Sequence, residues 1–318
     1  LNPVGRGNVQ RYSLMGDPAQ RLALPRYSVD IDMPDSIWAL EEIRVRGRVL
    51  DPQRRPATDF NGQAWLQVFD SAVSSRLGRL VYKRGGAPLY RTLIGVASGR
   101  FEATFRVPKD ISYRQKEGRV SAYAWEPDAG RIAFGSVRNV VLAGTAEGIR
   151  ADDDGPEISI AFKGKERFAS GDFISANPVL TAGIRDSSGI NITGETGHEI
   201  ELRVDDEIFK VTELFSSRGD YRSGFLEVEL PELEPGNHTI RLKAWDTFNN
   251  SAFAEVEVQV AELAKFVLSQ VLFYPNPWRE QEEGFFTYVL ATPVESVRIR
   301  VFSLAGKLVD DIDGGRLG

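Results

Sequence analysis

The sequence predicts an all-β protein built from β-sandwich domains. Apolar and polar residues alternate with a period of two through most of the chain, which is the pattern of half-buried strands. Segments long enough for an amphipathic helix are nearly absent. The chain also contains 30 glycines and 16 prolines, which separate the alternating segments and favour turns between strands.

The alternating segments follow one another along the whole chain. In the segment EIRVRGRVL, Ile43 and Val45 alternate with charged residues, as one buried face of a strand requires. An apolar run that ends at Tyr274 predicts a further strand, which must stop there because Pro275 and Pro277 fix φ and remove backbone donors. The clearest strands are expected over residues 42–50, 100–108, 118–126, 198–206, 225–231, 238–246, 254–260 and 297–303.

Changes in composition divide the chain into four parts. The acidic run that begins at Asp152 and the Gly155-Pro156 breaker interrupt the strand pattern and predict a linker. Each segment of about 100 residues between such breaks has the length of one sandwich. We expect the end of an upstream domain over 1–26, a first β-sandwich over 27–150, a second over 151–262 and the start of an incomplete third over 263–318.

Composition excludes several classes of function. The net charge of −6 and the pI near 5.3 argue against nucleic-acid binding, which requires a basic surface. The longest uncharged apolar stretch, at about 266–274, is too short to span a membrane. The chain begins Leu1-Asn2-Pro3 without a signal sequence, so we expect its natural start to lie upstream.

The chain also offers little material for catalysis. It has no cysteine, and it has two histidines, His198 and His238. Neither histidine lies in a sequence motif that would orient it as a general base. A cysteine–histidine dyad and a three-histidine zinc site are therefore impossible, and no Gly-x-Ser-x-Gly motif is present. We expect both histidines to be structural, and we expect no catalytic residue and no cofactor in this chain.

Two groups of acidic residues are weak candidates for a calcium site. Carboxylates in a constrained turn are suitable ligands for Ca²⁺, although this ion takes six to eight oxygens and no EF-hand loop is present. The group in the linker can equally be solvated without a metal. The group around Asp246 can equally make side-chain-to-backbone hydrogen bonds in a turn. The candidates are Asp152, Asp153 and Asp154 in the linker, and Asp246 in the segment AWDTFNNSA.

A local basic segment stands out in this acidic protein. Residues 71–100 contain no acidic residue. Such a surface could bind an anionic glycan, lipopolysaccharide or the acidic face of a protein, or it could be a solvated hairpin. The candidate partner-binding residues are Arg76, Arg79, Lys83, Arg84 and Arg91.

Several segments together resemble one protein family. Residues 12–22, YSLMGDPAQRL, resemble the end of the peptidase domain in gingipain-family cysteine peptidases. The following segments, in their order and spacing, are similar to PorU-type sortases of the type IX secretion system: DFNGQAWLQVFD, GRFEATFRVPKDISYRQKEGRVSAYAWE, DDDGPEISI, IRDSSGINITGETGHEIELRVDD, LEPGNHTIRLKAWDTFNNS and VLFYPNPW. The chain departs from the family pattern at Glu199, at Trp278 and over Thr212–Phe215.

The resemblance implies a domain plan and a location. It implies an upstream gingipain-like domain that carries the catalytic histidine and cysteine, then immunoglobulin-like β-domains, then a terminal sorting-type domain. It places such a protein on the extracellular face of the outer membrane, where it cleaves carboxy-terminal signals from secreted cargo. The implied partners are the upstream peptidase domain, an outer-membrane β-barrel, cargo signal domains and anionic lipopolysaccharide. The present chain would be a non-catalytic arm that positions the peptidase.

An adhesin or glycan-binding module of another secreted gingipain-like peptidase is the alternative. Exposed rings at Trp65, Trp125 or Tyr90 would favour it, because a sugar-binding face needs accessible aromatic side chains. If the third sandwich is incomplete, we also expect an open sheet edge near residues 297–309.

Overall fold

A computed structural model describes residues 24–112, 117–165, 167–194, 197–261, 268–279, 283–290 and 296–313. These residues form strands joined by turns, with one short 3₁₀ helix at Thr212–Leu214, so the all-β prediction is confirmed. The part of the chain that the structure describes contains no helix with the length and apolar character needed to cross a bilayer. The predicted end of an upstream domain falls almost wholly outside the described residues.

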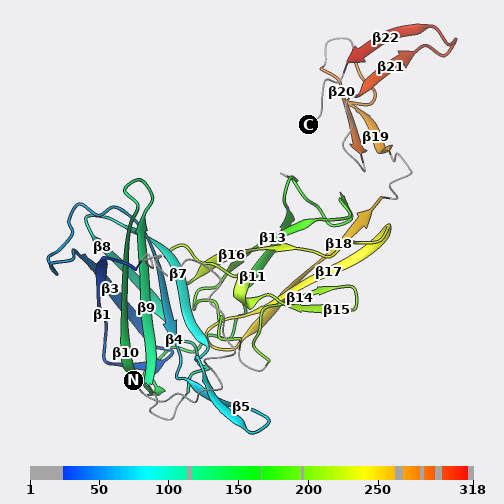
Figure 1. The fold of residues 1–318 in the computed structure, drawn as a ribbon. Coiled ribbons are helices and arrows are strands. Elements are labelled where there is room, and N and C mark those ends of the chain that lie inside the picture. Colours follow the sequence, from blue (N-terminus) through cyan, green and yellow to red (C-terminus); the bar gives the residue numbers. More distant parts are fainter. Residues whose placement is uncertain are drawn as a thin grey trace, which may run out of the picture.

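The first module is one curved sheet whose inner face forms its core (Figure 1). The sheet runs in the order β7-β4-β9-β10-β1-β3-β8, and β2 pairs with β10. Its strands are β1 (Tyr27–Asp32), β2 (Ser36–Ala39), β3 (Glu42–Leu50), β4 (Gly62–Phe69), β7 (Pro88–Val96), β8 (Arg100–Arg106), β9 (Glu117–Glu126) and β10 (Arg131–Thr145).

Alternation explains the core of this module. Inward residues of β3 and β8, such as Val45 and Phe105, join inward residues of β4 and β9, such as Leu66 and Ala122, in one buried cluster. The two edge strands also meet in the core, because the ring of Tyr90 on β7 stacks on Phe105 of β8 with centroids 4.7 Å apart. The sheet therefore nearly closes on itself between β7 and β8.

The second module is a sandwich of two sheets around a second buried cluster. One sheet has the order β11-β13-β16 and the other β12-β18-β17-β14-β15. The strands are β11 (Glu157–Phe162), β12 (Phe173–Ile174), β13 (Val179–Arg185), β14 (Glu201–Val204), β15 (Glu207–Lys210), β16 (Ser223–Glu229), β17 (Gly236–Trp245) and β18 (Ser251–Val260).

A segment of the second module fills the gap between β7 and β8. Ser217 forms a parallel bridge with Thr92 of β7, and Asp220 forms one with Thr104 of β8. The amide of Leu93 donates to the Ser217 carbonyl at 3.2 Å. We call residues 216–221 the closing segment, because they pair with both free edges of the first sheet. The two modules are thereby joined by backbone pairing as well as by the linker.

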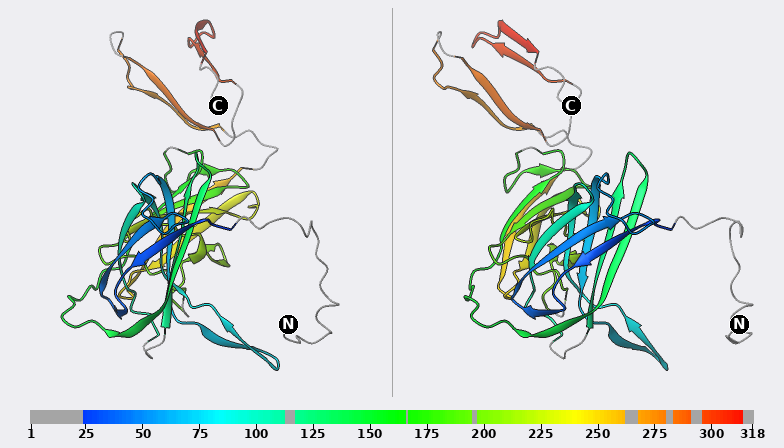
Figure 2. Two further views of the ribbon diagram at one scale, coloured as in Figure 1. Left: turned by 60° about the vertical axis from the view of Figure 1, so that its left-hand side comes forward. Right: turned by 90° about the vertical axis from the view of Figure 1, so that its left-hand side faces the viewer.

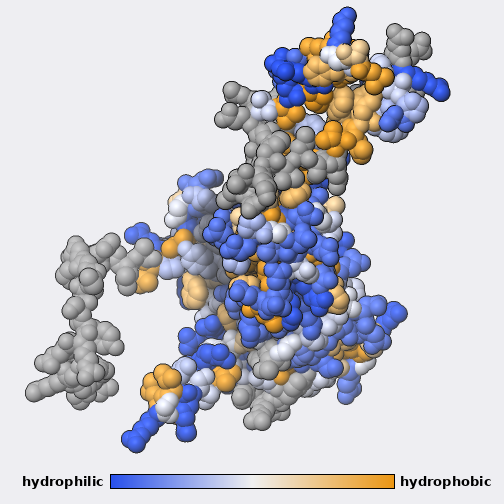
Figure 3. Space-filling model, turned by 90° about the vertical axis from the view of Figure 1, so that its right-hand side faces the viewer, coloured by the Kyte–Doolittle hydropathy of each residue, from blue (hydrophilic) through white to orange (hydrophobic). Residues whose placement is uncertain are grey.

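The last described strands form two separate hairpins. β19 (Leu268–Tyr274) pairs with β20 (Phe285–Leu290), and β21 (Arg298–Phe302) pairs with β22 (Leu308–Asp313). Among the described residues, each of these strands pairs with one other strand only. The bonds before Pro275 and Pro277 are both cis. Figure 3 shows apolar residues on the surface of these hairpins, at the top of the view.

Candidate functional site

The structure separates the predicted basic residues into two places. Arg76, Arg79, Lys83 and Arg84 all lie exposed on one hairpin of β5 (Val73–Leu77) and β6 (Leu80–Arg84). Figure 2 shows this hairpin projecting from the first module in both views. Arg91 does not join them, since it lies on β7 and its side chain is buried.

Arg91 acts inside the protein and is not available to a partner. Its Nη2 donates to the backbone carbonyls of Thr212 at 3.0 Å and Phe215 at 3.1 Å. Its Nη1 forms an ion pair of 2.8 Å with Glu213. The planar guanidinium thus satisfies carbonyl groups at the 3₁₀ helix of the second module, a geometry that suits arginine better than lysine. Arg91 belongs to the contact between the modules.

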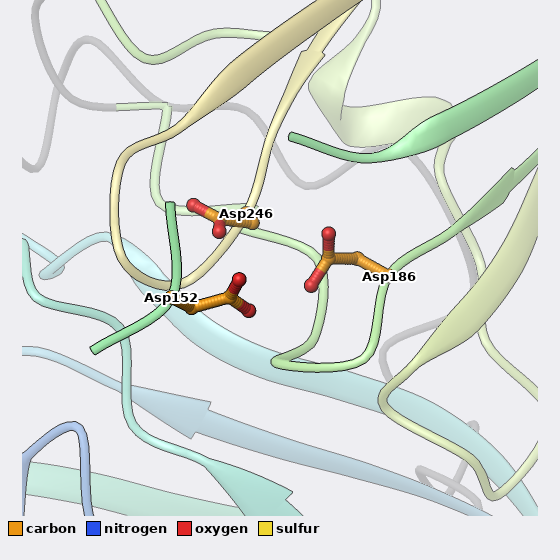
Figure 4. A group of neighbouring side chains, drawn as sticks. All are labelled: Asp152, Asp186 and Asp246. Atoms are coloured by element: carbon orange, nitrogen blue, oxygen red, sulfur yellow. The ribbon is translucent and has the colours of Figure 1, made fainter. Parts of the chain in front are cut away.

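Three aspartates from different segments of the chain meet in one place (Figure 4). Asp152 comes from the linker, Asp186 follows β13, and Asp246 follows β17. One carboxylate oxygen from each lies within 4.8 Å of the others. Asp153 and Asp154, also candidates from the sequence, are exposed and lie outside this cluster. We call Asp152, Asp186 and Asp246 the aspartate cluster.

Hydrogen bonds fix the two buried members of the aspartate cluster. Asp246 accepts from the backbone amides of Phe248 at 3.0 Å and Asn250 at 2.6 Å, which is the turn geometry that the sequence suggested. Asp186 accepts from the amide and the hydroxyl of Ser188, both at 2.7 Å. The side chain of Asn250 donates to the other oxygen of Asp246 at 2.8 Å.

Burial raises the pKa of both carboxyl groups. Desolvation raises the pKa of Asp246 to about 6, and the nearby charge of Asp186 adds to this effect, while hydrogen bonds from Asn250 oppose it. Desolvation also raises the pKa of Asp186, and the charge of Asp152 adds to it. The cluster therefore concentrates negative charge where ionisation is unfavourable, and it can either share protons or hold a hard cation.

Sequence reasoning missed Asp186, although a signal for it existed. The segment Asp186-Ser-Ser-Gly189 directly follows a strand, as Asp246 does, and polar turns at the same end of a sandwich lie close together. The oxygens of the aspartate cluster suit Ca²⁺ in type. The Asn250 side chain, however, donates to both the Asp152 carbonyl and the Asp246 carboxylate. These hydrogen bonds occupy lone pairs that would otherwise coordinate a cation.

The two histidines lie apart, each beside an aspartate. His198 Nδ1 contacts the carboxylate of Asp110, and its ring packs edge-on against Trp245 with centroids 4.5 Å apart. His238 pairs with Asp205 at 2.7 Å. Burial alone would lower the pKa of His238, but the bonds to Asp205 and to the Glu234 carbonyl outweigh it and raise the pKa.

Asp110 connects the modules through several donors. It follows β8 of the first module, yet its Oδ1 accepts from the Asn249 side chain at 2.8 Å and its Oδ2 from Asn191 at 3.0 Å. His198 is a third partner of Asp110, and all three partners belong to the second module. The sequence contains no signal that Asp110 binds the second module.

An aromatic row crosses the outer face of the first sheet. Register places Trp65 of β4 beside Leu93 of β7 and Tyr123 of β9, and Tyr123 beside Phe134 of β10. Tyr123 and Phe134 are exposed and Trp65 is half-buried. Trp125 extends this row, since its ring centroid lies 5.9 Å from that of Tyr123. Tyr90, by contrast, is buried on the inner face.

Comparison with known proteins finds similarity to a solved structure. No protein-family model matches the chain, and neither does any curated protein. The chain is similar to dimeric latent PorU from Porphyromonas gingivalis, with 28% identity and a TM-score of 0.47. The similarity covers 94% of this chain and 30% of the PorU chain, so the present chain spans under a third of that protein.

Other solved structures show weaker similarity. Spo0M, a sporulation control protein from Bacillus subtilis, is 10% identical, with a TM-score of 0.29 and coverage of 83% of this chain and 90% of that chain. Red sea bream transglutaminase is 16% identical, with a TM-score of 0.24 and coverage of 74% and 32%. These values carry no functional conclusion.

Proposed function

We propose that this chain is a non-catalytic β-domain arm of a cell-surface, gingipain-like cysteine peptidase of the PorU sortase type. In this role it holds the upstream peptidase domain at a fixed distance from an outer-membrane β-barrel partner and from cargo signal domains. The parent protein would cleave carboxy-terminal signals from secreted cargo, and anionic lipopolysaccharide would be a further ligand. The cysteine-free chain contributes no nucleophilic thiol to that reaction.

The observation that carries this proposal is the joint between the modules. An arm sets a distance only if its parts do not swing, and domains linked by a short connection alone usually do. Here the closing segment pairs with both edges of the first sheet, and Arg91 and Asp110 bind the second module on either side of it. These contacts restrict rotation between the two modules, as a spacer requires. The ordered segments that resemble PorU-type sortases support a parent of that type.

Affinity capture tests the proposal. Immobilised chain should retain the outer-membrane barrel partner or a cargo signal domain from the same organism, and deletion of residues 262–318 should locate the contact. The matched control is Arg138→Glu, which changes one exposed charge on β10 of the first module. Retention of neither partner by the full chain or the shortened chain would contradict the proposed role.

Glycan binding is a second candidate function, and the aromatic row favours it. Trp65, Tyr123 and Phe134 present neighbouring rings on one outer face at the spacing of adjacent strands, about 4.8 Å. Flat apolar rings of this kind pack against the faces of sugar rings, and the half-buried Trp125 enlarges the surface. The burial of Tyr90 removes that residue from the candidate surface.

Calorimetric titration with bacterial surface polysaccharide separates the two functions. If the aromatic row binds glycan, Tyr123→Ala and Trp65→Ala should each weaken binding at least about tenfold. Trp38→Ala is the matched control, because Trp38 is exposed on β2, outside the row. Equal affinity of all three variants would remove the glycan function and leave the spacer role unaffected.

A further inference from the structure

The β5–β6 hairpin stands apart from the rest of the sheet. β5 and β6 form a two-stranded sheet of their own, in which Val73 pairs with Arg84 and Leu77 with Leu80. Gly78 has a φ of 59° at the turn, a conformation that glycine adopts without strain. Figures 1 and 2 show the hairpin extending away from the body of the first module.

The tip of this hairpin is apolar on both faces. Leu77 and Leu80 are 72% and 62% exposed, and Val81 is 59% exposed. Register places Leu77, Leu80 and Tyr82 on one face, and Val81 on the other. A two-stranded hairpin in water gains little from such side chains, and large exposed apolar groups that cluster indicate an interaction surface.

Cations surround the apolar tip without acidic partners. Arg76 and Lys83 lie on the same face as Val81, Arg84 lies on the other face, and Arg79 lies in the turn. No acidic residue occurs between residues 71 and 100. Within the described residues, no ion pair involves Arg76, Arg79, Lys83 or Arg84, whereas Arg91 on β7 pairs with Glu213. Figure 3 shows apolar and hydrophilic residues side by side on the projecting hairpin, at the lower left.

We propose that the β5–β6 hairpin docks end-on into an anionic lipid surface. Leu77 and Leu80 enter the boundary between headgroups and acyl chains, and Arg76, Arg79 and Lys83 bind lipid phosphates around them. Two residues of a strand rise about 7 Å, which matches the roughly 5–10 Å depth of interfacial segments. The inference stands on the hairpin alone and does not depend on the parent protein.

The distribution of side chains favours a lipid surface over the acidic face of a protein. A protein groove covers one face of a hairpin, or pairs with one edge, and would leave either Val81 or Tyr82 in water. A fluid interface surrounds the tip and receives both faces together. Backbone groups at the outer strand edges limit insertion to the headgroup region, where water and phosphates satisfy them.

Vesicle flotation tests the proposal with vesicles of phosphatidylcholine alone and with 30% phosphatidylglycerol. We expect the intact chain to float with the anionic vesicles only, and less as salt concentration rises. The variant Leu77→Ser/Leu80→Ser should bind at least about tenfold more weakly, and Arg76→Glu/Lys83→Glu about a hundredfold or more. Matched controls are Ile208→Ser, exposed on β15, and Arg138→Glu on β10, neither of which should change binding.

The absence of native cysteine permits a direct measure of insertion. A polarity-sensitive fluorophore on Leu80→Cys should shift to the blue with anionic vesicles, whereas the same label on Ile208→Cys should not. Binding without a shift at Leu80 would contradict insertion. Failure of the chain to float would overturn the proposal, and a shift with poly-glutamate but not with vesicles would assign the hairpin to an acidic protein instead.

Discussion

The hydroxyl of Tyr221 donates a hydrogen bond of 2.7 Å to the carboxylate of Glu42, although the two residues belong to different modules. Tyr221 follows the bridges of the closing segment, and its ring lies in the buried cluster of the first module. The first core is thus completed by a residue that lies 179 positions further along the chain than its partner.

Tyr221→Ala should destabilise both modules together. The change empties part of the first core and should lower the free energy of unfolding by about 3–5 kcal/mol, whereas Tyr221→Phe, which loses only the hydrogen bond, should cost about 1–3 kcal/mol. Denaturant unfolding, with fluorescence and circular dichroism as separate probes, should show one coincident transition for the intact pair. Tyr82→Ala is the control, since Tyr82 is exposed on β6. Equal losses for Tyr221→Ala and Tyr82→Ala would contradict the assignment.

Arg91→Ala should lower stability far more than loss of its ion-pair partner. The variant leaves the Phe215 carbonyl without this donor and the Thr212 carbonyl with the Phe215 amide alone, at a cost of about 2–4 kcal/mol. Glu213→Gln should cost at most about 1 kcal/mol, because the Glu213 side chain is 76% exposed. Thermal unfolding of both variants beside Arg84→Ala checks this order, and similar losses for Arg91→Ala and Arg84→Ala would refute it.

Asp110→Ala should loosen the opposite side of the joint. It removes the acceptor of His198, Asn191 and Asn249 at once, and we expect a loss of about 2–4 kcal/mol. Asp30→Ala is the matched control, because Asp30 forms an ion pair of 2.7 Å with the exposed Arg48 and such pairs contribute about 0–1 kcal/mol. Limited proteolysis should cleave near the joint faster in the Asp110 variant. Unchanged cleavage would show that Asp110 does not hold the modules together.

The aspartate cluster should make stability fall as pH rises from about 4 to 7. The pKa of Asp246 is raised from 3.8 to about 6, so the folded state binds more protons than the unfolded state in this window. The contribution of Asp246 to the free energy of unfolding is present below pH 4. It is lost as pH passes 6, by up to about 3 kcal/mol. Asp152→Asn removes a negative charge beside the buried pair. The stability of this variant relative to the unchanged protein should therefore increase with pH.

Unfolding curves of the two proteins at pH 5 and pH 7.5 measure this difference. A constant difference between the two pH values would contradict the coupling of Asp152 to the buried pair. Calcium gives a second readout of the same cluster, since a bound cation would stabilise the unchanged protein at pH 7.5 and the Asp152 variant less. No calcium response in either protein would leave proton sharing as the behaviour of these carboxyl groups.

Local patterns predicted the strands, but not the contacts between modules. The alternation around Val45 and Leu202 gave the correct buried faces, because a period of two depends on neighbouring residues only. The same alternation along β7 places Arg91 on the outer face of the first sheet. The sequence contains no sign that a second module covers this residue. Tyr221 is one aromatic residue in a polar loop, and only the three-dimensional arrangement shows that a gap in another domain receives it.

The basic segment and the acidic turns were predicted with unequal success. A continuous run without acidic residues identified the exposed hairpin, because its members are close in sequence. The aspartate cluster brings together Asp152 from the linker and Asp186 and Asp246 from two distant turns. Pairing between turns depends on which strands are neighbours, so sequence reasoning recovered Asp152 and Asp246 as separate candidates and missed Asp186.

The closing segment also sets an order of events during synthesis. Thr92 and Ser217 are 125 positions apart in the chain, so all strands of the first sheet leave the ribosome well before the closing segment is synthesised. At roughly 5–20 residues per second, the ribosome leaves the gap between β7 and β8 open for several seconds. During that interval two unpaired strand edges face the surroundings, where other chains can compete for them. A nascent chain arrested before Ser217 is therefore the form most exposed to misassembly.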